Sequence, residues 1–258
     1  MLSIKPLALF TISLLGFASL LAAPSAQAQF RVSPLVIEEK SERGQAQGVI
    51  EIANPGDTAT QVRIYASPFT YDESGFVELD SHAFDLSPYL FFSPKEVTIE
   101  PGQIRRIRLS ARLLPSLPDG EYRSVIFTRS ETPNIEERDG FRVNIVPRIG
   151  VLFFVRKGDT SPDLIPESAS FDVAEDFIEL RISNQGTESI RPSISWTLSQ
   201  GEDILETGEI SKKMAIAGER IRVQIDPEIE LSPGSYQIEG NISEDAISVP
   251  FSFDFVIP

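Results

Sequence analysis

The sequence has no cysteine, and its 258 residues include one histidine, one tryptophan and two methionines. Without cysteine, disulfide bonds and thiolate metal sites are excluded, so stability has to come from buried cores. The single histidine excludes a histidine-rich metal cluster, and the sequence contains neither a nucleophile elbow nor a phosphate-binding glycine loop. We therefore expect no catalytic, metal or cofactor site, and we expect His82 to lie exposed in a loop. An enzyme is the least favoured class.

Long hydrophobic runs are also scarce, because only residues 7–23 form one. Lys5 precedes this run and Ala26-Gln27-Ala28 follows it, a pattern typical of a secretory signal peptide over residues 1–28. An N-terminal membrane anchor is the alternative, but polar residues interrupt the run and Pro24 ends it. We expect cleavage before Gln29 and no membrane insertion of the mature chain.

Positive charge is scarce in the second half of the chain. Residues 29–157 hold 16 Lys and Arg against 18 Asp and Glu, a net charge of −2, whereas residues 158–258 hold 6 against 20, a net charge of −14. The change coincides with the polar segment 157–166, whose two prolines are typical of a linker. We expect two domains, 29–157 and 158–258. The acidic second half argues against partners such as nucleic acid or an anionic membrane.

What the sequence does contain is alternation of apolar and polar residues, with no convincing helical periodicity. The alternation predicts strands within residues 49–52, 62–67, 104–113, 122–128, 178–182, 194–198, 221–225, 236–238 and 247–255. In each half a tyrosine, Tyr122 or Tyr236, follows a glycine turn, which suits a strand corner where the hydroxyl bonds back to the main chain. The pattern predicts an all-β fold of two tandem immunoglobulin-like β-sandwich domains.

Residues 141–155 form the most regular stretch, because every odd position in it is apolar. Side chains alternate across a strand, so we expect one β-strand over 141–155, far longer than the usual five or six residues. One interpretation is a core strand that runs into a linker. The other is a strand that lends its apolar side chains to a partner chain.

The first half resembles the periplasmic pilus-assembly chaperones of the PapD type and their relatives. The matching pieces, in order, are Val32-Ser33-Pro34, Asn54, Ser93-Pro94, Pro101-Gly102-Gln103 before Ile107-Arg108-Leu109, and Gly120-Glu121-Tyr122-Arg123. The second half matches in size and type with little motif support, so the resemblance covers most of the mature chain. It implies two immunoglobulin-like domains set in an L or boomerang, and a periplasmic location.

The resemblance also implies a mechanism and a class of partner. A chaperone of this type inserts alternate apolar residues of its long strand into a secreted subunit that lacks its last strand. The partner would be a pilin-like or other surface subunit, with an outer-membrane usher as a second candidate partner. In this sequence the partner-binding residues would be Phe141, Val143, Ile145 and Arg148.

The sequence departs from the family at the carboxylate anchor. The family places an arginine on the first strand and a lysine on the long strand, where this chain has Val36 and Leu152. Arg148 or Arg156 are the candidate substitutes, and Pro147 removes one main-chain donor from the long strand. The missing anchors favour the alternative function, a structural or interaction module of the cell envelope or surface, whereas the alternating strand favours the chaperone.

Overall fold

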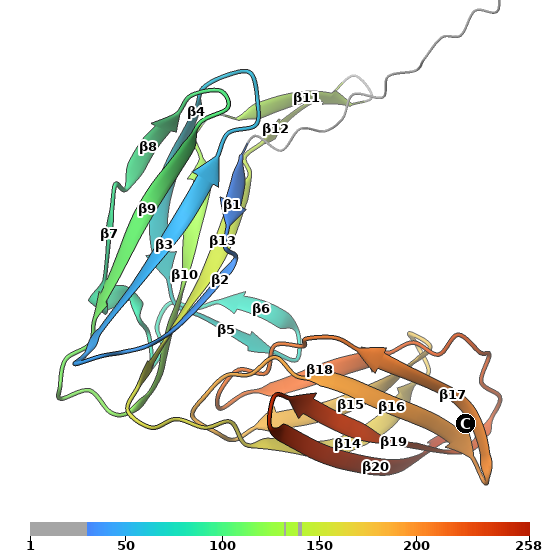
Figure 1. The fold of residues 1–258 in the computed structure, drawn as a ribbon. Coiled ribbons are helices and arrows are strands. Elements are labelled where there is room, and N and C mark those ends of the chain that lie inside the picture. The colour runs from blue at the N-terminus through green and yellow to red at the C-terminus, as the bar shows by residue number, and fades with distance from the viewer. Residues whose placement is uncertain (1–29, 132, 139–140) are drawn as a thin grey trace, which may run out of the picture.

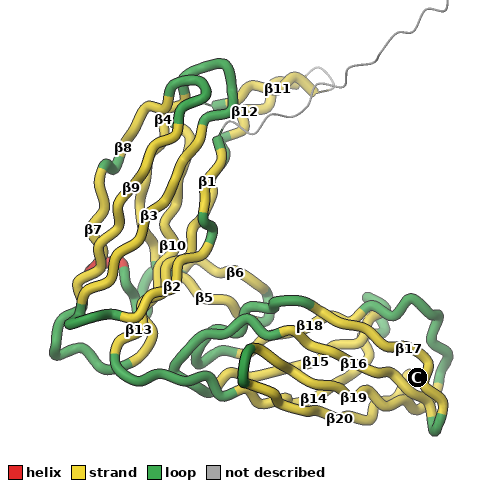
Figure 2. The backbone as a smooth tube through the Cα atoms, in the orientation of Figure 1, coloured by secondary structure: helices red, strands yellow, loops and turns green. Residues whose placement is uncertain are grey.

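Strands are the dominant element of the computed structural model, which describes residues 30–131, 133–138 and 141–258. The predicted signal peptide, residues 1–28, lies outside the described residues. The strands form two β-sandwiches arranged as an L (Figures 1 and 2). The expectation of two tandem immunoglobulin-like sandwiches is confirmed. In the described ranges no helix is long and apolar enough to cross a membrane.

The first domain packs two sheets face to face. Its first sheet has the order β1 (Arg31–Ser33), β3 (Gln45–Ala53), β9 (Ile104–Arg112) and β7 (Leu90–Ser93). Its second sheet has the order β2 (Val36–Lys40), β13 (Arg148–Lys157), β10 (Gly120–Ser130), β4 (Thr60–Ser67) and β8 (Glu96–Ile99). Alternate residues of each sheet fill the core, such as Ile50, Ile107 and Phe153, all fully buried. A single turn of 3-10 helix, η1 (Ser87–Tyr89), precedes β7.

Two hairpins extend from this domain. The hairpin of β5 (Phe69–Asp72) and β6 (Gly75–Glu78) lies at the corner of the L and reaches toward the second domain (Figure 1). The hairpin of β11 (Asn134–Arg138) and β12 (Phe141–Ile145) projects from the opposite end of the domain. It forms a separate two-stranded sheet, inserted between β10 and β13 in the chain.

The second domain has the same plan. One sheet has the order β14 (Leu164–Asp172), β15 (Phe177–Asn184) and β18 (Arg220–Ile225). The other has the order β17 (Asp203–Ile210), β16 (Ser193–Gln200), β19 (Gly234–Glu244) and β20 (Ile247–Ile257). Between them lies an apolar core that includes Leu180, Trp196 and Tyr236.

The two predicted tyrosine corners are confirmed. The Tyr122 hydroxyl donates to the Pro118 carbonyl at 2.9 Å, and the Tyr236 hydroxyl donates to the Ser232 carbonyl at 2.7 Å. Each bond spans four residues and fixes the turn before a central strand, so both domains use the same device at the same point.

The prediction of one continuous strand over 141–155 is wrong, because the structure has two strands, β12 (Phe141–Ile145) and β13 (Arg148–Lys157). Pro147 lies in the break; it has no N–H to donate and its ring fixes the backbone. The two parts also differ in burial. Val151, Phe153 and Val155 are fully buried in the core of the first domain, so these residues are not available to a partner.

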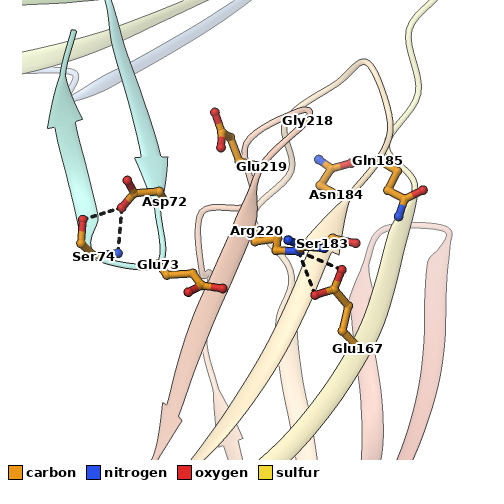
Figure 3. Close-up of a pocket in the computed structure, with 10 residues that line it drawn as sticks. All are labelled: Asp72, Glu73, Ser74, Glu167, Ser183, Asn184, Gln185, Gly218, Glu219 and Arg220. Carbon is orange, nitrogen blue, oxygen red and sulfur yellow. Dashed lines mark hydrogen bonds and ion pairs between the residues drawn. The ribbon is translucent and has the colours of Figure 1, made fainter.

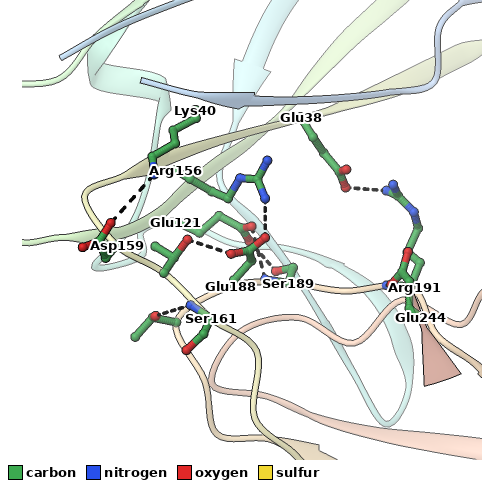
Figure 4. Close-up of polar contacts among 12 residues, drawn as sticks. Glu38, Lys40, Glu121, Arg156, Asp159, Ser161, Glu188, Ser189, Arg191 and Glu244 are labelled. Atoms are coloured by element: carbon green, nitrogen blue, oxygen red, sulfur yellow. Dashed lines mark hydrogen bonds and ion pairs between the residues drawn. The ribbon is translucent and has the colours of Figure 1, made fainter. Parts of the chain in front are cut away.

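Polar contacts join the two domains at the corner of the L (Figure 4). Glu121 accepts hydrogen bonds from the main chain and hydroxyl of Ser189, and Arg156 pairs with Glu188. Farther along, Arg191 pairs with Glu38 at 2.7 Å. An apolar cluster accompanies them, in which Ile216 of the second domain packs with Phe69, Val125, Phe127, Leu152 and Phe154 of the first. The corner is therefore a packed contact rather than a free linker.

Candidate functional site

The edge of β13 before Leu152, on the side away from β10, pairs with no strand in the described part of the chain. β2 pairs with β13 only from Leu152 onward, where the Leu152 N–H donates to the Leu35 carbonyl at 2.9 Å. Main-chain groups two residues apart in a strand point to the same side. Arg148 and Gly150 therefore direct their N–H and C=O groups to the side where β2 is absent, which leaves donors and acceptors for an added strand.

β12 extends this edge and carries three of the four predicted partner-binding residues. It pairs with β11 alone among the described strands. Val143 is 41% exposed and Ile145 is half-buried, while the side chain of Phe141 lies outside the described residues. Val143 and Ile145 are alternate residues of β12, so their side chains lie on the same face of that strand.

An apolar hollow of about 430 Å³ lies beside the open edge, on the outer face of the second sheet. It is lined by Leu35, Val36, Tyr71, Phe76, Val125, Phe127, Arg148, Gly150 and Leu152. Val36 and Leu152, the two positions expected to lack a carboxylate anchor, are paired neighbours across β2 and β13. The structure therefore brings the two positions together, and the surface between them is apolar.

Arg148, the fourth predicted residue, lies at this hollow instead of on the β12 face. Its guanidinium group stacks on Phe127, with 3.9 Å between Cζ and the ring centre, and donates to the Tyr65 hydroxyl and to Glu78. These acceptors raise the pKa of Arg148, so its charge is fixed. The other candidate substitute, Arg156, is held at the domain contact by Glu188. Of the two candidate substitutes for the anchor, Arg148 is therefore the one that lies at the hollow.

The β5–β6 hairpin is part of this site and was not predicted from the sequence. Phe69 and Phe76 stack with 5.7 Å between ring centres, and Phe69 also contacts Phe154 edge to face. The hairpin thus covers one end of the outer face of the second sheet and leaves the hollow at its margin. The turn residues Asp72-Glu73-Ser74-Gly75 between aromatic residues were the available signal.

The expectation that His82 is solvent-exposed is wrong. Its ring is half-buried: Nδ1 accepts from the Phe84 N–H at 3.0 Å, and Nε2 lies 3.1 Å from Nη2 of the buried Arg123. Burial, and then the charge of Arg123, lower the pKa of His82 below its ordinary value of 6.5, against the smaller opposite effects of Glu219 and Asp85. The neutral ring is therefore a structural partner of Arg123.

This contact predicts a pH dependence of stability. Below pH 6.5 the unfolded chain binds a proton at His82 that the folded chain resists, so this contribution to stability is present above pH 6.5 and is lost as the pH falls through the lower folded pKa. We expect urea unfolding between pH 7.5 and 5.5 to show a steeper acid loss for the wild type than for His82→Gln. One proton limits the difference to about 1.4 kcal/mol per pH unit. Parallel profiles of the two proteins would contradict the assignment.

Comparison with known proteins finds the fold but no sequence relative. No protein-family model matches the chain, and no curated protein matches it. Among solved structures, the class 5 fimbriae chaperone CfaA is similar over 89% of this chain and 99% of its own, with 14% identity and a TM-score of 0.50. The chaperone YadV is similar over 88% and 100%, with 14% identity and a TM-score of 0.50.

A third similar structure is that of a complex. A chain of the CsuC–CsuE chaperone–tip adhesion subunit pre-assembly complex, from the archaic chaperone-usher Csu pili of Acinetobacter baumannii, is similar over 88% of this chain and 98% of its own. The identity is 16% and the TM-score 0.51. At these identities the likeness establishes the fold, which is the two-domain fold of fimbrial chaperones, as the PapD-type resemblance implied.

Proposed function

We propose that this protein is a periplasmic chaperone-like protein that binds a secreted pilin-like subunit by donating the strand edge of β12 and β13. The observation that carries the proposal is the edge of β12 and of β13 before Leu152, which pairs with no further strand among those described and lies beside the exposed Val143. An added strand would gain main-chain hydrogen bonds along this edge, and alternate side chains would give specificity.

The apolar character of Val143 and Ile145 supports a partner that lacks a strand of its own. Such a subunit exposes a hydrophobic gap and an unpaired edge, which are aggregation hazards until they are covered. The CsuC–CsuE structure is of a chaperone with a tip adhesion subunit, which is the class of partner we infer for this chain. Because we predict a signal peptide, we infer that the encounter occurs in the periplasm, with an outer-membrane usher as the next partner.

The hollow at Val36 and Leu152 distinguishes the proposed mode of binding from one in which two cations anchor a carboxylate of the partner. Its apolar lining offers no pair of cations for a terminal carboxylate, and Arg148 is already engaged by Glu78. We infer that affinity comes from strand addition and apolar burial, with Arg148 as the single cation at the margin. A structural module of the envelope is the second candidate function, because the chain lacks the carboxylate anchor that the family's mechanism uses.

A photo-crosslinking amino acid at Val143 tests the proposal in the native host. We expect ultraviolet irradiation to link position 143 to a secreted subunit, which mass spectrometry identifies. Matched controls are Ile204 and Val256, apolar residues of the second domain that are 69% and 66% exposed. Because strand donation is local, these positions should give no such product. Equal yields at all three positions, or none at 143, would contradict strand donation.

A further inference from the structure

A polar crevice of about 620 Å³ separates the turn of the β5–β6 hairpin from the second domain (Figure 3). Its walls come from that turn, from β14 and the end of β15, and from the start of β18. The lining residues are Asp72, Glu73, Ser74, Glu167, Ser183, Asn184, Gln185, Gly218, Glu219 and Arg220. This crevice is separate from the apolar hollow beside the open edge, with which it shares no lining residue.

The lining of the crevice is negative, with four carboxylates against one guanidinium group, and one of the four, Glu219, already accepts from the Thr70 hydroxyl and faces the charge of Arg123. Arg220 donates to Glu167 at 3.1 Å, so the one cation is already paired. Hydrogen bonds from the Ser74 hydroxyl and main chain lower the pKa of Asp72, which keeps that carboxylate ionised. Glu73 is exposed and has no ion-pair partner within the described ranges.

Ser183 adds an unsatisfied acceptor and donor to this crevice. Ile182 beside it points into the core of the second domain, so alternation along β15 turns Ser183 to the outer face, toward the hairpin. The residue is only 5% exposed, yet its Oγ has no hydrogen-bond partner among the described residues. Figure 3 shows it beside Arg220 and Glu167. A buried hydroxyl without a partner costs free energy, and a ligand that supplies a donor would recover it.

We propose that this crevice binds an organic cation, an alkylammonium or guanidinium group, whose N–H donates to Ser183 Oγ while the surrounding carboxylates balance its charge. The described residues contain no group of three His, Asp or Glu side chains close enough to hold a metal ion. Carboxylates spread over both walls suit an elongated cation with several N–H donors, such as a lysine or arginine side chain or a polyamine. This inference does not depend on strand donation.

Two-dimensional NMR titration of the full mature protein tests the inference with two probes, spermidine and the blocked peptide acetyl-Gly-Arg-Gly-Arg-Gly-amide. We expect amide shifts at Asp72 to Ser74 and at Gly218 to Arg220, and weaker binding as salt is added. Ser183→Ala should weaken binding about tenfold, through loss of one charge-assisted hydrogen bond. Glu73→Gln should weaken it about three- to fivefold, as expected for one exposed charge.

The matched control is Glu202→Gln, which removes an exposed carboxylate of the β16–β17 turn, outside the crevice. It should leave the affinity unchanged. Binding of the peptide alone would identify a protein side chain as the ligand, and binding of spermidine alone would identify a free polyamine; either supports the inference. It is overturned if neither probe binds, if Ser183→Ala and Glu73→Gln both bind as tightly as the wild type, or if Glu202→Gln weakens binding as much as Glu73→Gln.

Discussion

Replacing Ile145 by aspartate is expected to reduce binding of the subunit captured at Val143 by about 100-fold or more. If β12 is donated, Ile145 fills an apolar gap in the partner, and an unpaired carboxylate buried there costs several kcal/mol. In the free protein Ile145 is only half-buried on a two-stranded hairpin, so the free energy of unfolding should fall by less than about 1 kcal/mol. Co-purification and thermal unfolding measure the two quantities on the same protein.

The matched control is Asn144→Asp, which adds the same charge to the opposite, exposed face of β12. Its affinity should stay within about threefold of the wild type, because an exposed charge adds little to binding. Val143→Asp offers a second test on the donated face. An Ile145→Asp variant that folds and still retains the subunit would rule out strand donation and leave the structural module. A variant that fails to fold would make Ile145 a core residue.

The sequence predicted those elements whose burial follows the two-residue period of a strand. In β9 the alternation places Ile107, Leu109 and Ala111 in the core, and the structure buries all three. β17 gives no such signal, because it is an edge strand whose residues are exposed or half-buried. At 141–155 the alternation concealed a break, because Pro147 occupies an odd position and counts as apolar although it cannot donate a main-chain hydrogen bond.

The candidate site was less predictable than the fold because it depends on contacts distant in sequence. Nothing in the neighbourhood of His82 indicates that Arg123, 41 residues later, will bury it. The apolar hollow likewise joins Val36, Phe76 and Leu152 from three separate strands. Local patterns can mark an exposed apolar residue such as Val143, but which edge lies open follows only from the order of strands in the sheet.

Replacing Arg123 by methionine is expected to reduce the free energy of unfolding by about 3–5 kcal/mol. Arg123 is only 2% exposed, and its Nε donates to the Phe69 carbonyl of the β5–β6 hairpin at 3.4 Å. Burial lowers the pKa of Arg123, and the charges of Glu121 and Glu219, one from each domain, oppose that effect. Methionine fills a similar volume without a charge or donor. The loss should be large because removal of one partner leaves the other buried charge uncompensated.

Arg129→Met is the matched control, because Arg129 lies on the same strand but is exposed, so stability should change by less than about 0.5 kcal/mol. Adding Glu121→Gln to Arg123→Met should recover part of the loss, since it removes the uncompensated carboxylate. A loss below about 1 kcal/mol for Arg123→Met would contradict the role assigned to Arg123.

The pH profile of the Arg123→Met variant separates an electrostatic loss from a packing loss. Burial raises the pKa of Glu121, and Arg123 is among the groups that lower it, so removal of Arg123 should raise that pKa further. A carboxyl group with a raised folded pKa favours folding at low pH, and this contribution is lost as the pH rises through the folded pKa. The deficit of Arg123→Met relative to the wild type should therefore be smaller at pH 4.5 than at pH 7.5 in urea unfolding. A deficit that is the same at both pH values would assign the effect to lost packing alone.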